Sequence, residues 1–132
     1  MCVMYLLSKM TKFKTRKISI NNRGFTAYIA DTPLKQAVGL MFRAKLRKNE
    51  CMVFAFRTAQ KYGIWMRNMN FPIDIIWLDG QKRVVYIKHN AKPARGLDFT
   101  THRPSAIARY VLELPSGTAK NIKINTGQRV SV

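Results

Sequence analysis

The chain has 132 residues, a length at which a single domain buries roughly 65–70% of the surface that its unfolded chain exposes. Apolar residues make up 47% of it, and no run approaches the roughly 18 consecutive apolar residues that a membrane-spanning helix needs. Lys and Arg number 24 against 6 Asp and Glu, so the formal net charge is +18. We therefore expect one domain without a transmembrane segment, whose surface binds polyanions such as nucleic acid or anionic lipid non-specifically.

Residues 1–16 are predicted to be a basic, disordered tail, and residues 17–132 a single β-sandwich domain. In the tail a short apolar run, 2–7, precedes the basic run 9–17, which is the wrong order for a secretory signal. A membrane-surface anchor is the alternative for this segment. Because there are only two cysteines, Cys2 and Cys51, we expect a reducing compartment and a cytoplasmic location, or an exported or membrane-associated one if the true start lies upstream.

The first predicted elements are two strands, 18–20 and 25–30, which form a hairpin around the turn 21–24, since residues 25–30 alternate between apolar and other side chains. A helix of about two turns follows. Asp31 or Thr32 caps its N-terminus, Pro33 takes its first position, and Gly39 ends it.

The later segments predict further strands. Residues 51–56 and 62–66 are apolar and aromatic-rich, and residues 74–78 and 83–88 flank Asp79-Gly80-Gln81, the strongest hairpin signal. The pattern ends with a strand over 106–114, a turn or short helix over 116–121 and a last strand near 129–132; the longest loop is 91–105. So many short strands predict a mainly β fold, a compact β-sandwich or jelly-roll-like barrel with one or two short helices.

Polar side chains intrude into segments that otherwise look like core. The stretch 65–79 contains an arginine, two asparagines and a carboxylate among apolar residues. Strand alternation places Asp74 on the face of Ile76 and Glu113 on the face of Val111. Buried polar groups must be paired or must serve a ligand, so these positions are candidates for a network or a site.

Two interpretations of these residues stay open. In the first they form a buried, internally satisfied network that holds the domain together. In the second they lie at the mouth of a small pocket walled by Trp65, Trp77 and methionines, suited to a polar small molecule or a glycan. The candidate ligand-binding residues are Arg43, Trp65, Asn68, Asp74 and Glu113. Arg67 is expected to be a solvated or an edge residue.

Familiar catalytic motifs are missing from the sequence. It has no glycine-rich phosphate loop, no Gly-x-Ser-x-Gly elbow, and no Cys-x-x-Cys or His-x-x-x-His pair, so it predicts no cofactor, no metal site and a binding protein rather than an enzyme. His89 and His102 are expected on the surface or in loops, and Cys51 in the core. The alternatives are a hydrolase, with Asp74 and Glu113 as weak candidates for its acid and base, and a nucleic-acid-associated accessory protein that uses the basic surface.

Several motifs together resemble one family. They are the segments 31–32 with 39–43, 52–56, 65–68 with 72–74, the 79–80 hairpin, Pro93, and 110–113 with Gly117 and Gly127. Over residues 18–132 the chain resembles the family catalogued as domain of unknown function 192. The resemblance implies a compact, mainly β sandwich with a short helix, no established activity, and recurrent polar positions at Arg43, Asn68, Asp74 and Glu113, with Trp65 and Met66 on an aromatic strand.

The chain departs from that family in three respects. Cys51 stands where the family usually has a glycine, many members carry an export signal or a lipid anchor that is not readable here, and the charge of +18 is not implied by the family pattern. The sequence leaves the ligand and the oligomeric state open.

Overall fold

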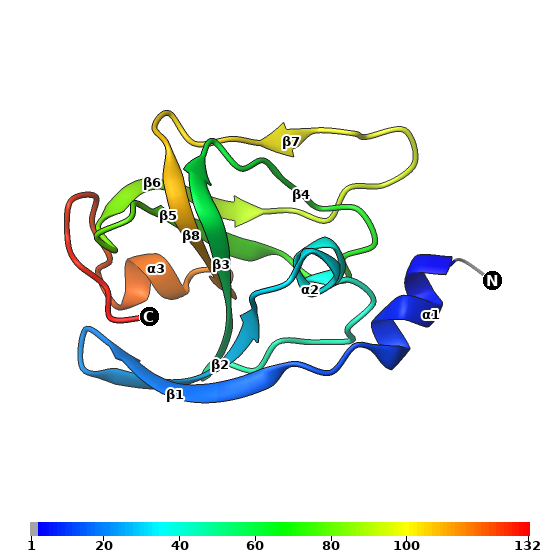
Figure 1. Cartoon of the computed structure of the whole chain (residues 1–132), viewed down its shortest axis with the longest axis horizontal. Helices are drawn as coiled ribbons and strands as arrows, with labels where there is room; N and C mark the ends of the chain where they lie inside the picture. The colour runs from blue at the N-terminus through cyan, green and yellow to red at the C-terminus, as the bar shows by residue number, and fades with distance from the viewer. Residues whose placement is uncertain (1–2) are drawn as a thin grey trace.

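The computed structural model describes residues 3–132 as a six-stranded sheet, a two-stranded sheet and three short helices (Figure 1). In chain order the elements are α1 (Val3–Met10), β1 (Lys14–Ile20), β2 (Arg23–Ala30), α2 (Pro33–Val38), β3 (Glu50–Gln60), β4 (Ile64–Trp65), β5 (Ile73–Leu78), β6 (Val84–Ala91), β7 (Thr101–His102), β8 (Ala108–Pro115) and α3 (Thr118–Asn121). The predicted mainly β fold with short helices is confirmed. No helix within residues 3–132 is both long and apolar enough to cross a bilayer.

The main sheet has the strand order β1-β2-β3-β8-β5-β6, and β4 pairs with β7 in the smaller sheet. All neighbours in the main sheet are antiparallel except β2 and β3, which run parallel. Parallel neighbours need a long crossover connection, and residues 31–49, which include α2, provide it. This crossover brings α2 and the loop after it across the end of the sheet, where the candidate site lies.

Local sequence explains the two elements that lead into this crossover. Asn21 and Asn22 both have positive φ, at 49° and 67°. A two-residue hairpin turn with positive φ at both positions matches the twist of the strands on either side of it. At α2 the Thr32 hydroxyl accepts a hydrogen bond from the N–H of Lys35 at 3.2 Å, and Pro33 occupies the first turn. The predicted hairpin and the predicted capped helix are both confirmed.

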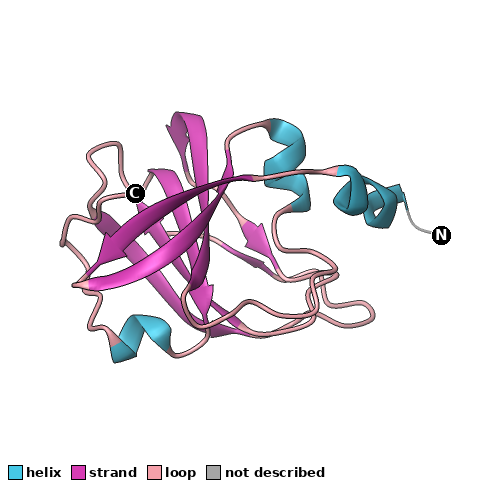
Figure 2. Ribbon diagram, turned by 90° about the horizontal axis from the view of Figure 1, so that it is seen from below, coloured by secondary structure: helices cyan, strands magenta, loops and turns pink. Residues whose placement is uncertain are grey.

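Each face of the main sheet carries its own core cluster. One cluster includes Ile76 and Leu112 and is covered by residues of α3 and the C-terminal segment, such as Ala119 and Val130. We call this the α3 face. The other cluster includes Ile75 and Val111 from the same two strands and is covered by Leu40, Met66 and Met69 from the loops around α2 and β4. We call this the α2 face; Figures 1 and 2 show α2 and α3 on opposite sides of the strands.

The two chain ends differ from the sequence predictions. Within residues 1–16, predicted as a disordered tail, the structure has α1 and the first residues of β1; residues 1–2 lie outside the described part. The Tyr5 ring packs edge-on against Phe42, with ring centres 5.5 Å apart, which gives α1 a tertiary contact that the sequence pattern does not show. The predicted strand near 129–132 is wrong, because Arg129 makes only an isolated bridge with Arg83.

Asp74 on β5 joins three elements of the structure. Its side chain is fully buried on the α3 face; Oδ1 accepts from the N–H of Asn90 and Oδ2 accepts from the N–H of Ala119, both at 2.9 Å. One carboxylate thereby connects the end of β6 and the first turn of α3 to β5. Hydrogen bonds to a charged group contribute more than neutral ones, about 1.5–3 kcal/mol each, so Asp74 has a structural role.

We predict that Asp74→Ala lowers the free energy of unfolding by about 3–5 kcal/mol, because it leaves the buried N–H of Ala119 and the partly buried N–H of Asn90 without their acceptor. Urea unfolding followed by circular dichroism measures the change. The control is Asp31→Ala, which removes a surface carboxylate 3.6 Å from Lys35 and is expected to cost about 1 kcal/mol or less. A loss at Asp74 no larger than the loss at Asp31 would contradict the structural role.

Candidate functional site

A pocket of about 220 Å³ lies on the α2 face, between α2 with its following loop and the β4 segment. Its lining residues are Gln36, Ala37, Val38, Gly39, Leu40, Met41, Phe54, Gly63, Ile64, Trp65, Met66, Met69 and Glu113. Most of these side chains are apolar, and none of them is Lys or Arg. We call this the Glu113 pocket.

Glu113 is the one acidic residue that lines the pocket. It pairs with Met52 on β3 and with Ile75 on β5, so its side chain points to the α2 face, and only 4% of its surface is exposed. Burial raises the pKa of its carboxyl to about 8, and no hydrogen bond or charge within residues 3–132 offsets that effect. The carboxyl is therefore protonated at neutral pH, and in that state it can both donate and accept a hydrogen bond.

The helix wall of the pocket is fixed by Gln36. Its Nε2 donates to the carbonyls of Ala30 at 3.2 Å, at the end of β2, and of Ala55 at 2.9 Å, in the middle of β3. These two bonds fix the orientation of the amide and leave Oε1 as its free acceptor. Gln36 is thus a second polar group on the pocket lining, held in place by the sheet.

Gly39 lets the chain pass close to the sheet after α2. Its φ is +50°, in the left-handed region that favours glycine, and an added Cβ would lie 3.2 Å from the Phe54 ring. The wall of the pocket at this point is therefore backbone and aromatic ring in direct contact.

The loop after α2 is held from the other side by two asparagines. The carbonyl of Asn68 accepts from the N–H of Phe42 at 2.8 Å, and Asn68 Nδ2 lies 3.8 Å from the sulfur of Met41. Asn70 Nδ2 donates to the carbonyl of Arg43 at 2.9 Å. Asn68 also adopts a φ of 60°, which asparagine tolerates better than most residues. Asn68 therefore shapes the loop and does not line the pocket.

Trp65 lies at the open side of the pocket. It is 46% exposed and belongs to the short strand β4, whereas the neighbouring Met66 is buried. Trp77, expected as a second wall, is instead fully buried in the core, and its Nε1 donates to the carbonyl of Tyr62 at 2.8 Å. The pocket thus combines one exposed flat apolar surface, Trp65, with two hydrogen-bonding groups, the Glu113 carboxyl and the Gln36 amide.

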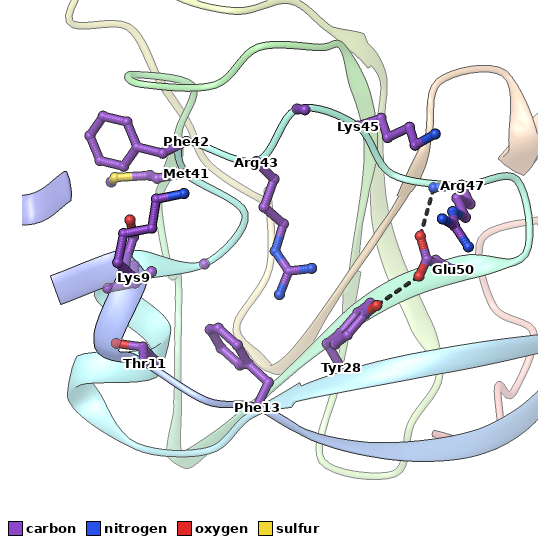
Figure 3. Close-up of a pocket in the computed structure, with 14 residues that line it drawn as sticks. Lys9, Thr11, Phe13, Tyr28, Met41, Phe42, Arg43, Lys45, Arg47 and Glu50 are labelled. Atoms are coloured by element: carbon purple, nitrogen blue, oxygen red, sulfur yellow. Dashed lines mark hydrogen bonds between the residues drawn. The ribbon is translucent and has the colours of Figure 1, made fainter. Parts of the chain in front are cut away.

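Arg43 lies in a neighbouring cleft and not in the Glu113 pocket. It is half-buried, and its guanidinium lies 4.3 Å from the centre of the Tyr28 ring and 5.5 Å from that of Phe13 (Figure 3). Val38 at the end of α2 and the loop residues Gly39 and Met41 line both cavities. The loop that Asn68 and Asn70 hold thus separates two cavities of different character.

The five predicted ligand-binding residues therefore do not form one cluster. Trp65 and Glu113 share the pocket, while Asp74 pairs with Leu114 and points to the α3 face. Because adjacent positions of a strand point to opposite faces, the carboxyls of Asp74 and Glu113 are separated by the sheet. They cannot act as a general acid and base on one substrate, which removes the geometric basis of the predicted hydrolase alternative.

Other reactive groups lie elsewhere. Cys51 is fully buried, and burial raises the pKa of its thiol to about 12, so it packs as a small apolar side chain. Arg67, expected to be a solvated or an edge residue, donates to the carbonyls of Gly96 and Asp98 and covers the exposed ring of Phe99. Residues 3–132 contain no group of three or more His, Cys, Asp or Glu side chains that could hold a metal ion.

Sequence reasoning missed Gln36, Gly39 and Met41 as parts of the site. Gly39 and Met41 were part of a recognised motif, but only as a helix end and an apolar run. Gln36 carried one usable signal: it follows the cap and Pro33 on a helix of about two turns, where a polar side chain can reach the neighbouring strands. The parallel crossover that brings these residues over Glu113 was not predicted.

Solved structures of other proteins share this fold. A protein of unknown function from Novosphingobium aromaticivorans is 32% identical, with a TM-score of 0.78 over 89% of this chain and 83% of that one. One from Sinorhizobium meliloti, named as a proposed transcription regulator, is 25% identical, with a TM-score of 0.79 over 92% of this chain and 95% of that one.

Among curated proteins, a UPF0127 protein of Thermococcus kodakarensis is 31% identical over 103 residues, which cover 78% of this chain and 62% of that protein. The chain thus spans less than two thirds of the length of this relative. The family model of DUF192, described as an uncharacterised conserved protein family, matches residues 16–132. The chain therefore belongs to the DUF192 family.

Proposed function

We propose that this chain binds a small, neutral molecule that carries hydroxyl or carbonyl groups, and that a single sugar unit, free or part of a glycan, is the leading class. The observation that carries the proposal is Glu113, a protonated carboxyl on the pocket lining without a partner in residues 3–132. A ligand hydroxyl that meets the carboxyl supplies the hydrogen-bond partner that the protein itself does not provide.

The size and surface of the pocket support this class. Its volume of about 220 Å³ is below the roughly 300–1,000 Å³ of sites for drug-sized ligands, and it equals that of about seven waters in the liquid. One sugar ring is of that size. Trp65 offers an exposed flat face on which an apolar ring face can stack, and the Oε1 of Gln36 adds an acceptor for a second hydroxyl.

The charge of the site favours a neutral ligand. No Lys or Arg lines the pocket, so an anion would find no partner there, and Glu113 carries no charge at neutral pH with which to hold a cation. The net charge of +18 also repels cations from the whole molecule. Binding should therefore depend little on salt.

A nucleic-acid-associated role is the second candidate function. It is supported by the charge of +18 and by the name of the Sinorhizobium meliloti protein. Because the Glu113 pocket holds no basic residue, this role would use another surface. It predicts binding to oligonucleotides whose log affinity falls with log salt by about 0.9 for each phosphate contacted. If this role holds, Glu113→Gln should bind oligonucleotides with the same affinity as the wild type and with the same dependence of log affinity on log salt.

We predict that neutral monosaccharides at saturating concentration raise the unfolding midpoint by about 2–8 °C, because a ligand that binds only the native state stabilises it. Thermal unfolding is measured with hexoses, pentoses and N-acetylated sugars. Trp65→Ala should abolish the rise, while Phe99→Ala, which removes another exposed aromatic ring outside the pocket, should keep it. No rise with any sugar, or an equal rise in both variants, would overturn the proposal.

We also predict a pH dependence of stability that Glu113→Gln removes. The folded pKa of about 8 lies above the ordinary value near 4.3, so the folded state keeps a proton that the unfolded state has lost. The contribution is fully present below about pH 4.3 and is lost as the pH rises to 8, at about 1.4 kcal/mol per pH unit at most. Urea unfolding from pH 5 to 9 measures it.

The comparison between wild type and Glu113→Gln isolates this effect, because every other titrating group is common to both proteins. The wild type should lose stability relative to the variant between pH 5 and 8, and the difference should be constant above pH 8. Parallel stability curves over pH 5–8 would show that Glu113 is ionised in the folded state.

A further inference from the structure

A second, larger cavity adjoins the Glu113 pocket. It has a volume of about 580 Å³ and lies where α1 and the residues after it meet the loop that follows α2 (Figure 3). Its lining residues are Ser8, Lys9, Thr11, Phe13, Tyr28, Val38, Gly39, Met41, Phe42, Arg43, Ala44, Lys45, Arg47 and Glu50. We call it the Arg43 cleft.

The Arg43 cleft has an excess of positive charge. Lys9, Arg43, Lys45 and Arg47 line it, and Glu50 is the one acidic residue among the lining. The Glu50 carboxylate is already occupied: Oε2 accepts from the Tyr28 hydroxyl at 2.7 Å and Oε1 accepts from the N–H of Arg47 at 2.9 Å. No side-chain ion pair within residues 3–132 involves these four cations. Glu50 offsets part of the charge of Arg43 and Arg47, and the remaining excess of positive charge is left for a ligand.

Arg43 is positioned before any ligand arrives. Its guanidinium stacks over the Tyr28 ring at 4.3 Å, and Figure 3 shows the side chain pointing into the cleft. Its backbone carbonyl accepts from Asn70 Nδ2 at 2.9 Å, which fixes the loop that carries it. A half-buried, stacked guanidinium loses little freedom on binding, and its planar fork matches two oxygens of one anion.

We propose that the Arg43 cleft is a binding site for a phosphate ester. Arg43 holds two phosphate oxygens, and Lys9 and Lys45 add positive charge elsewhere on the lining of the cleft. The cleft has four cationic side chains and one carboxylate, Glu50, which is already hydrogen-bonded. This excess of positive charge suits a ligand with several negative charges better than a ligand with a single carboxylate. The half-buried ring of Phe13 provides an apolar surface for the group that carries the phosphate. This site is separate from the Glu113 pocket and does not depend on the sugar proposal.

Two kinds of molecule could supply the phosphate group: a soluble phosphate ester and the headgroup of a lipid. Helix α1, which contributes Lys9 to the cleft, exposes Val3, Leu6 and Met10, and their spacing places them along one side of the helix. Apolar helix faces next to basic residues are typical of helices that lie on anionic membranes. The experiment therefore includes vesicles.

The experiment titrates the full chain with inorganic pyrophosphate by calorimetry, and with phosphatidylcholine vesicles with and without phosphatidic acid by sedimentation. Wild type is compared with Arg43→Gln and Arg57→Gln; Arg57 is exposed on β3 outside the cleft, so its variant makes the same change of charge elsewhere. We expect saturable binding at one site, at least tenfold weaker in Arg43→Gln and unchanged in Arg57→Gln. Arg43→Lys, which keeps the charge and loses the fork, should lie between them.

The two arms identify the source. Pyrophosphate binding that depends on Arg43 indicates a soluble compound that carries phosphate. Binding only to vesicles with phosphatidic acid, dependent on Arg43 and weakened by Leu6→Ser, indicates a headgroup. No binding in either arm, or equal losses in Arg43→Gln and Arg57→Gln, would overturn the site, since general charge would then explain the result. Glu113→Gln should bind both probes as wild type does, so the outcome is independent of the sugar site.

Discussion

The inner strands β5 and β8 are buried on both faces, and this constraint decides what each polar residue on them does. A carboxyl there has no bulk water, so it must find a partner or lose its charge. Asp74 finds two N–H partners and joins β6 and α3 to the sheet. Glu113, on the neighbouring strand and the opposite face, finds none and keeps its proton. The same burial therefore gives one structural carboxylate and one carboxyl directed at a pocket.

The loop after α2 determines the two cavities. Gly39 brings it close to Phe54, and Asn68 and Asn70 hold its far side, so the loop forms a shared wall. On one side the wall faces Glu113, with Trp65 exposed nearby; on the other it presents Arg43 above Tyr28. A neutral, mainly apolar pocket and a basic cleft thus lie on the two sides of one loop in the crossover between β2 and β3. Their different charges are the reason for proposing two different ligand classes.

The sequence predicted the local features and missed those that depend on distant pairing. The hairpin at Asn21 and Asn22, the Thr32 cap and the burial of Asp74 and Glu113 follow from turn chemistry, capping and alternation, which act over a few residues. Alternation alone cannot say that Asp74 and Glu113 face apart, because that depends on the register in which Ile75 opposes Glu113. Likewise the parallel pairing of β2 with β3, which brings α2 over Glu113, joins segments far apart in the chain.

The central claim is that Glu113 keeps its proton in the folded protein. The chain has two glutamates, Glu50 and Glu113, so carbon-13 labelling of glutamate side chains gives two carboxyl signals. Burial raises the pKa of Glu50, but the hydrogen bonds from Tyr28 and the Arg47 N–H outweigh it and lower the value overall. An NMR titration from pH 3 to 9 should show one midpoint below the ordinary value of about 4.3 and one near 8. Two midpoints between about pH 4 and 5 would contradict the account.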